Sequence, residues 1–234
     1  MSNNQNKSEP VAAPGEPAQN GGNGQGANGE EKKKEQEELP PFEVVEGSRI
    51  PASSFKFQFK NVEYSSGRNK TLLCYTVERA EGQIFRGYLE DEHVSAHAEE
   101  AFFTNVLPQY ISSSPVSITC YVSSSPCVNC AASIARCLRR YKTLKLHLVV
   151  ARLFQWEESE IRGALRAISS AGCKLRMMKS SDYLHVWQNF VEPDIILDEE
   201  GQVEQQSEQE VFIPWEDLDE NAKYYEEKLA EILR

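Results

Sequence analysis

The sequence reads SSSPCVNC from residue 123 to residue 130, and HAE stands upstream at residues 97 to 99. Cys127 and Cys130 are three residues apart, so on one helix their side chains lie on the same face. Zinc is tetrahedral and takes thiolate and imidazole ligands, and a catalytic zinc site has three protein ligands and one position for water. We therefore predict that His97, Cys127 and Cys130 bind one zinc ion per chain.

The two cysteines stand where a helix is expected to begin. Ser125 is placed to be its N-cap, and Pro126 suits the first helical position, where the missing N–H costs nothing. The unpaired amides and the positive dipole end would favour thiolate over thiol at both cysteines. Glu99 follows His97 by two residues, which on an ideal helix turns it about 200 degrees away. We expect Glu99 to move protons rather than to bind the ion.

The combination of H-x-E with P-C-x-x-C is the established signature of zinc nucleobase deaminases. A lone C-x-x-C would also suit a redox pair or half of a zinc ribbon. A ribbon needs a second C-x-x-C, which the remaining cysteines do not form, and a redox pair leaves His97 and Glu99 without a role. Cys74, Cys120 and Cys137 are expected to be small core residues.

Strand and helix patterns alternate around these motifs. Phe55, Phe57 and Phe59 alternate with polar residues, which predicts a half-buried strand, and turn residues at 65–69 lead to a returning strand at 71–77. Further strands are predicted at 117–123, 144–153 and 174–178, and helices at 94–106, 127–140, 158–171, 182–191 and 215–233. This order predicts a mixed sheet covered by helices.

The two ends of the chain differ in composition from its middle. Residues 1–41 are rich in Asn, Gln, Gly, Pro, Glu and Lys, and we expect a disordered acidic tail. Residues 42–234 are expected to form one domain. Within it, the acidic, Gln-rich stretch 192–213 is expected to be a flexible excursion, and Gly172 is expected to end the helix at 158–171 in a left-handed conformation.

Charge is unevenly distributed along the chain. The 234 residues carry 25 Lys and Arg against 36 Asp and Glu, and a net charge of −11 by itself argues against a sequence-independent nucleic-acid binder. Residues 42–191 alone carry +4, whereas residues 1–41 carry −3 and residues 192–234 carry −12. The predicted zinc site therefore lies in a mildly basic core with acidic flanks.

The sequence also bears on the cellular compartment. No apolar run approaches the roughly 18 residues of a membrane helix, and the first residues lack the apolar core of a signal peptide. Six cysteines in 234 residues are too few for a disulfide framework. We expect no membrane association, reduced thiols, and a cytoplasmic and nuclear location. The run Lys32-Lys33-Lys34 is flanked by acidic residues, so a solvated charge run is favoured over a nuclear signal.

From Phe42 to the C-terminus the sequence resembles the AID/APOBEC family of polynucleotide cytidine deaminases. Beyond the zinc signature, the resemblance rests on GRNKTLLCYTVE at residues 67–78, ARLFQW at residues 151–156 and PWEDL at residues 214–218. These segments look like the family's hairpin, its fourth strand with the following aromatic loop, and the start of its last helix. The whole is most similar to the muscle-type branch, which carries an acidic N-terminal extension.

The resemblance implies a cytidine deaminase fold, a five-stranded mixed sheet flanked by about six helices, at residues 42–234. It implies a zinc-dependent hydrolase that converts cytosine to uracil in single-stranded RNA or DNA, with Glu99 as the catalytic residue. Such C-to-U editing would be linked to mRNA processing or to DNA demethylation. The free edge expected on a short hairpin strand also permits homo-oligomers.

The resemblance further assigns substrate contacts. The Ala98 N–H and the Ser125 hydroxyl resemble contacts to the base. Contacts to single-stranded nucleic acid are implied for Arg68, Lys70 and Thr71 on one loop and for Phe154 and Trp156 on another, where the aromatic pair can stack on bases.

Ser124 departs from the family pattern, because polynucleotide-editing relatives usually have a tryptophan at this position. Losing that aromatic wall would cost stacking worth roughly 1 to 3 kcal/mol per base, so turnover can be weak although the zinc ligands are complete.

A nucleic-acid-binding regulator with a structural zinc is therefore an alternative. A cluster of basic residues also supports this alternative: Arg136, Arg139, Arg140, Lys142, Lys145 and Arg152. The same cluster can be interpreted as a solvated helix face. A deaminase of free nucleosides is a third interpretation, and the aromatic pair argues against it.

Overall fold

The computed structural model describes residues 44–62, 68, 70–80, 82–91, 97–192, 195–197, 203–206 and 211–234. The tail predicted at residues 1–41 lies outside the described residues, as does the predicted turn at 65–69 except for Arg68.

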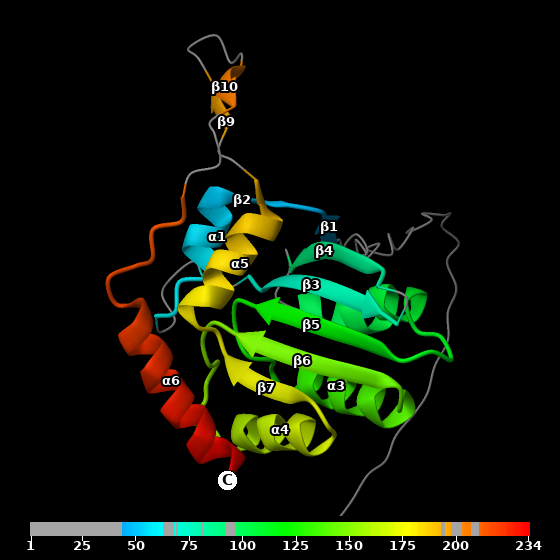
Figure 1. The fold of residues 1–234 in the computed structure, drawn as a ribbon. Coiled ribbons are helices and arrows are strands. Elements are labelled where there is room, and N and C mark those ends of the chain that lie inside the picture. The colour runs from blue at the N-terminus through cyan, green and yellow to red at the C-terminus, as the bar shows by residue number, and fades with distance from the viewer. Residues whose placement is uncertain are drawn as a thin grey trace, which may run out of the picture. The chain divides into compact units, whose positions relative to one another are not determined.

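The described residues contain a six-stranded sheet with the strand order β1-β4-β3-β5-β6-β7 (Figure 1). Its strands are β1 (Val44–Gly47), β3 (Leu72–Arg79), β4 (Ile84–Asp91), β5 (Val116–Val122), β6 (Leu144–Val150) and β7 (Lys174–Met177). β3 pairs antiparallel with β4 and β5, whereas β6 pairs parallel with β5 and β7. Strands β3 to β7 therefore form the five-stranded mixed sheet that the resemblance implies, and β1 extends it along β4.

Six α-helices accompany the sheet in the described residues. They are α1 (Ala52–Gln58), α2 (Ala98–Ala101), α3 (Val128–Arg140), α4 (Ser159–Ser170), α5 (Ser180–Phe190) and α6 (Leu218–Leu233). α2 continues into a π-helix at Phe102–Val106 and a 3-10 turn at Leu107–Gln109. None of the helices described is both long enough and apolar enough to cross a membrane.

Helices cover both faces of the sheet: α3 and α4 lie on one face, and α1 and α5 on the other (Figure 1). Alternate residues of β3 supply the two cores, as the period of two in a strand requires. Leu73 and Val77 pack in the core that includes α2, α3 and α4, whereas Leu72 and Cys74 pack in the core that includes α1 and α5.

Two shorter pairs of strands complete the description. β2 (Ile50–Pro51) pairs parallel with β8 (Val191–Glu192), which joins the segment before α1 to the end of α5. β9 (Ile195–Leu197) pairs antiparallel with β10 (Val203–Gln206), so the stretch predicted as a flexible excursion contains a strand pair.

The strand predicted around Phe55, Phe57 and Phe59 is wrong, because this segment forms α1. Phe55 and Phe59 are one helical turn apart, both are fully buried, and their ring centroids are 5.1 Å apart. Phe57 is 44% exposed. The spacing 55/59 fits both a period of two and one helical turn, and burial of that pair favours the helix. The hairpin partner of β3 is β4, downstream, which the sequence analysis did not predict.

The other predicted elements are confirmed with shifted ends. The strands predicted at 117–123, 144–153 and 174–178 are β5, β6 and β7, and the helices predicted at 94–106, 127–140, 158–171, 182–191 and 215–233 are α2 with its continuation, α3, α4, α5 and α6. Gly172 has a φ of 105°, as predicted. Its N–H donates to Ser169 O and the Cys173 N–H donates to Ile168 O, which are the paired bonds of a Schellman motif.

All six cysteines are free thiols, as predicted. The four outside the C-x-x-C motif are buried: Cys74, Cys120, Cys137 and Cys173. The hairpin edge, the side of β4 away from β3, is half covered: β1 pairs there with Tyr88–Asp91, and no strand in the described part of the chain pairs with Ile84–Gly87 on that side. The homo-oligomer stays a prediction.

Candidate active site

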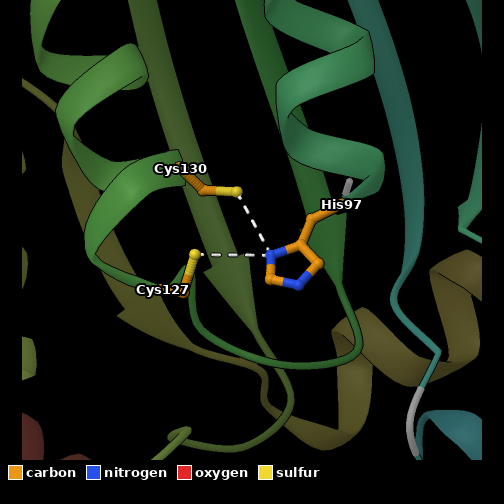
Figure 2. A group of neighbouring side chains, drawn as sticks. All are labelled: His97, Cys127 and Cys130. Atoms are coloured by element: carbon orange, nitrogen blue, oxygen red, sulfur yellow. Dashed lines mark hydrogen bonds between the residues drawn. The ribbon is translucent and has the colours of Figure 1, made fainter. Parts of the chain in front are cut away.

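His97, Cys127 and Cys130 lie together where α2 and α3 begin (Figure 2). His97 is the N-cap of α2, and its Nδ1 lies 3.4 Å from the sulfur of Cys127 and 3.4 Å from that of Cys130. Two ligand atoms at about 2.0 and 2.3 Å from one ion, at a tetrahedral angle, are about 3.5 Å apart. The three side chains therefore fit a tetrahedral metal ion with one imidazole and two sulfur ligands.

The structure corrects the predicted start of α3. Its N-cap is Cys127 in an extended conformation, not Ser125, and Val128 is the first helical residue. Ser125 is bonded elsewhere: its N–H donates to Arg152 O at 2.9 Å, and its hydroxyl accepts the Phe154 N–H at 2.8 Å. The prediction failed because the Ser125 hydroxyl ties the end of β5 to the loop after β6 and is not free to cap a helix.

The cluster contains a group suited to bind a cation. The pKa of Cys127 is lowered to about 3, first by the hydrogen bond from Cys130 and further by the hydrogen bond with His97. The pKa of Cys130 is raised by its bond to Cys127, and the pKa of His97 is raised to about 9, mainly by its bond to Cys127. A thiolate at Cys127 is a ready metal ligand, and metal binding would displace the remaining protons.

Glu99 lies in the first turn of α2 and is only 2% exposed. Its Oε2 has no hydrogen-bond partner among the described residues, and it is not part of the cluster of ligand atoms. Burial raises the pKa of Glu99 to about 7. A buried carboxylate oxygen without a partner is costly, so the site requires a water or a ligand beside it.

A cavity of about 710 Å³ connects the metal cluster with the predicted substrate contacts. This volume is within the range of small-molecule sites. Its lining includes most of the predicted site residues: His97, Glu99, Cys127, Ser125, Arg68, Lys70, Thr71, Phe154 and Trp156, together with Ser124. Cys130 and Ala98 are buried behind it, so the role predicted for the Ala98 N–H stays a prediction.

Two buried arginines line this cavity. Arg68 is 9% exposed, and its Nε and Nη1 have no hydrogen-bond partner in the described part of the chain. Arg152 donates to the carbonyl of Gln58 at the end of α1. Burial lowers the pKa of both guanidinium groups, and the charge of Arg68 lowers that of Arg152 further, to about 10. This wall of the cavity therefore favours an anion.

The remaining cation of the predicted loop, Lys70, is already paired. Its Nζ lies 2.9 Å from Glu90 Oε1. Arg152 does not belong to the surface cluster with which the sequence analysis grouped it, because it is buried whereas the other members are exposed: Arg136, Arg139, Arg140, Lys142 and Lys145.

Sequence reasoning missed several lining residues. Tyr225 reaches the cavity from α6, and the loop after β6 adds Leu153, Gln155, Glu157 and Glu158. No local signal could have found Tyr225, because it lies in a helix distant in sequence and has no motif of its own. Gln155 has a φ of 40°, the one positive value among the described non-glycine residues.

Comparison with known proteins agrees with this arrangement. The APOBEC2 family model matches residues 43–234. The human "C->U-editing enzyme APOBEC-2" is 54% identical over 233 residues, which cover 97% of this chain and 99% of that protein. The mouse protein of the same name is 51% identical over 232 residues, with 97% and 99% covered. The "DNA dC->dU-editing enzyme APOBEC-3G" of Erythrocebus patas is 27% identical over 194 residues, 77% of this chain and 47% of that protein. This chain belongs to the APOBEC2 family.

Proposed function

We propose that this chain is a zinc-dependent hydrolytic deaminase that converts cytosine to uracil in single-stranded RNA or DNA. The observation that carries the proposal is the buried Glu99 carboxylate, which has an unpartnered Oε2 and faces the same cavity as His97 and Cys127. Zinc deaminases need a three-ligand metal site and a separate Glu as acid and base. Relatives at 51% and 54% identity, which carry the name of C->U-editing enzymes, support the same activity.

The residues of the site divide the chemistry between them. Zinc held by His97, Cys127 and Cys130 would supply Lewis-acid activation of the water molecule that attacks C4 of cytosine. Glu99 accepts a proton from this water and delivers it to N3 of the ring, which its pKa of about 7 allows in both directions. Glu99 then takes the second proton of the added water, from the new hydroxyl on C4, and delivers it to the departing amino group. One water is consumed, one ammonia leaves, and uracil remains.

The cavity wall supports a polynucleotide substrate over a free nucleoside. The Nε and Nη1 of Arg68 need an acceptor, and a phosphate oxygen supplies one. Phe154 and Trp156 line the same cavity and offer ring surfaces for base stacking. A free cytidine would leave the buried guanidinium unsatisfied.

The test is uracil formation on a panel of cytosine-bearing RNA and DNA oligonucleotides by the zinc-loaded chain. Glu99→Gln removes the proton carrier, and the neighbouring Glu100→Gln is the matched control because Glu100 is exposed. We expect turnover by the wild type and by the control, and a loss of about 100-fold or more in Glu99→Gln. Equal background from all three chains on every substrate, with zinc bound, would contradict the proposal.

A second candidate function is a nucleic-acid-binding regulator with little catalysis. It is favoured by Ser124, which lines the cavity at the position where the resemblance implies a tryptophan in polynucleotide-editing enzymes. The exposed basic residues at the end of α3 and the start of β6 would supply phosphate contacts. A salt series of single-strand affinity tests this function, because a flat slope would exclude phosphate neutralisation. The editing of mRNA and the cytoplasmic and nuclear location stay predictions.

A further inference from the structure

Two side chains of α6, Tyr224 and Lys228, contact Trp156, and both lie outside the lining of the cavity. The ring of Tyr224 meets the indole edge-on, with centroids 6.3 Å apart and an interplanar angle of 79°. The Lys228 Nζ lies 5.4 Å from the centroid of Trp156 and 5.6 Å from that of Tyr224. Tyr224 and Lys228 are four residues apart on α6 and therefore share one face. Neither lines the cavity, whereas Trp156 does.

The backbone beside Trp156 is fixed in an unusual conformation. Gln155 has a φ of 40°, a left-handed value that glutamine rarely adopts. Such residues persist where the surrounding structure over-determines them, and they concentrate at binding sites. Here the Phe154 N–H donates to Ser125 Oγ on one side, and the Glu158 N–H donates to Gln155 O on the other. The rings on both sides of Gln155 line the cavity.

We infer that α6 is a brace for this wall: Tyr224 and Lys228 are positioning residues that hold the Trp156 indole ready to stack on a base of single-stranded nucleic acid. The identity of the bound base rests on the proposed function, whereas the brace rests on the contacts alone. A ring that is already ordered loses less conformational entropy when it binds. A cation over a ring face is attracted to it, which fixes Lys228 on the indole, and Glu231 holds the same ammonium at 3.5 Å.

The brace itself is tested in the chain labelled with 5-fluorotryptophan. The chain contains 3 tryptophans, and Trp156→Phe assigns the resonance of interest. Lys228→Met keeps the aliphatic stem and removes the cation, and Tyr224→Leu removes the ring. Lys223→Met is the matched control, an exposed lysine on the same helix.

We expect the Trp156 resonance to shift or broaden in both brace variants and to stay in place in Lys223→Met. The resonances of Trp187 and Trp215 report on the fold, because both residues pack in the other core, around α1 and α5. A Trp156 resonance unchanged in both brace variants would overturn the inference.

The consequence for binding is tested with a cytosine-bearing single strand and the zinc-loaded chain. Loss of pre-organisation should weaken affinity about 2- to 10-fold in both brace variants, raise KM and spare kcat. Tyr224→Leu separates the brace from a direct phosphate contact by Lys228, and Lys228→Arg should restore affinity. Wild-type affinity in both brace variants would overturn the inference. A wild type that binds no strand would instead overturn the proposed function, and the brace would still be decided by the fluorine resonance.

Discussion

At the scale of single residues, Arg68 carries the clearest consequence for binding. It is buried beside the cavity, and its guanidinium carbon lies 5.2 Å from the centroid of the Phe57 ring. The Phe57 ring packs against the guanidinium, whose Nε and Nη1 have no hydrogen-bond acceptor among the described residues. The guanidinium is therefore positioned to bind an incoming anion.

We predict that Arg68→Met weakens single-strand binding uniformly across sequences. The slope of log affinity against log salt should fall by about 1, because one phosphate contact is lost. Fluorescence anisotropy at several salt concentrations measures both quantities. An unchanged slope would show that Arg68 contacts no phosphate.

Ser124 lines the cavity at the position where the resemblance to polynucleotide-editing deaminases implies a tryptophan. We predict that Ser124→Trp restores a stacking surface worth roughly 1 to 3 kcal/mol, and so tightens single-strand binding about tenfold. Equilibrium binding and uracil formation on the same oligonucleotide measure the effect. An unchanged or weaker affinity in a folded variant would show that no base reaches this position.

At the scale of elements, the start of α5 depends on one carboxylate. Asp182 accepts hydrogen bonds from Arg176 Nη1 and Nη2 at 2.6 and 2.8 Å and from the Lys179 N–H at 2.8 Å. Burial by itself would raise the pKa of Asp182, but the bonds from Arg176 and the Lys179 N–H outweigh it and hold the pKa below its ordinary value of 3.8.

A lowered pKa in the folded state stabilises the fold above pH 3.8, and this stabilisation is lost as pH falls through the folded pKa. We predict that Asp182→Asn lowers the free energy of unfolding by about 1 to 3 kcal/mol at pH 7. Below the folded pKa the difference from the wild type should shrink, because both side chains are then neutral. Urea denaturation at pH 7 and near pH 3 measures it, and a gap that does not change with pH would refute this role for Asp182.

The two phenylalanines of α1, Phe55 and Phe57, give a second test at this scale. Phe55 is fully buried, with the rings of Phe59, Trp187, Phe212 and Trp215 around it, whereas Phe57 is largely exposed. We predict that Phe55→Ala lowers the free energy of unfolding by about 3 to 5 kcal/mol. Phe57→Ala, the matched control, should change it by less than about 1 kcal/mol. Similar losses at both positions would favour a strand and contradict the helix.

At the scale of the whole molecule, the charge of the full chain and the charge of residues 42–191 differ in sign. The −11 of the full chain arises outside residues 42–191, which carry +4. We predict that a chain of residues 42–234 unfolds at the same denaturant midpoint as the full chain and binds single strands with equal or slightly higher affinity, because residues 1–41 contribute only −3. A lower midpoint would show that the first 41 residues stabilise the domain.

Features that depend on residues close together in the sequence could be predicted from the sequence, whereas features that depend on distant residues could not. His97, Cys127 and Cys130 were predictable, because metal chemistry restricts residue types and spacing within short segments. The strands β5 and β6 were predictable from their many aliphatic and β-branched residues, and β7 from the alternation of charged and apolar residues in KLRM. β4 was not, since its sequence, IFRGYLED, combines charges with a central glycine and gains its strand identity from pairing with β3.

The cavity beyond the metal ligands depended on tertiary structure. Tyr225 and Arg152 reach it from α6 and from the loop after β6; Tyr225 has no local signature, and Arg152 was grouped with the exposed basic residues because its burial depends on the fold. Ser125 was predicted as a substrate contact and as the N-cap of α3. Its hydroxyl instead accepts a hydrogen bond from the Phe154 N–H, which is 29 residues away in the sequence and has no local signal.

The most direct test of the proposed deaminase site is the zinc coordination of the wild-type chain, measured as metal content with zinc K-edge X-ray absorption. The proposed site requires one zinc per chain with two sulfur ligands at about 2.3 Å, one imidazole nitrogen at about 2.0 Å and a light atom from water. That set leaves the open position that hydrolysis requires. A third sulfur, a second imidazole or a carboxylate as the fourth ligand would mark a closed structural site and contradict the proposed deaminase.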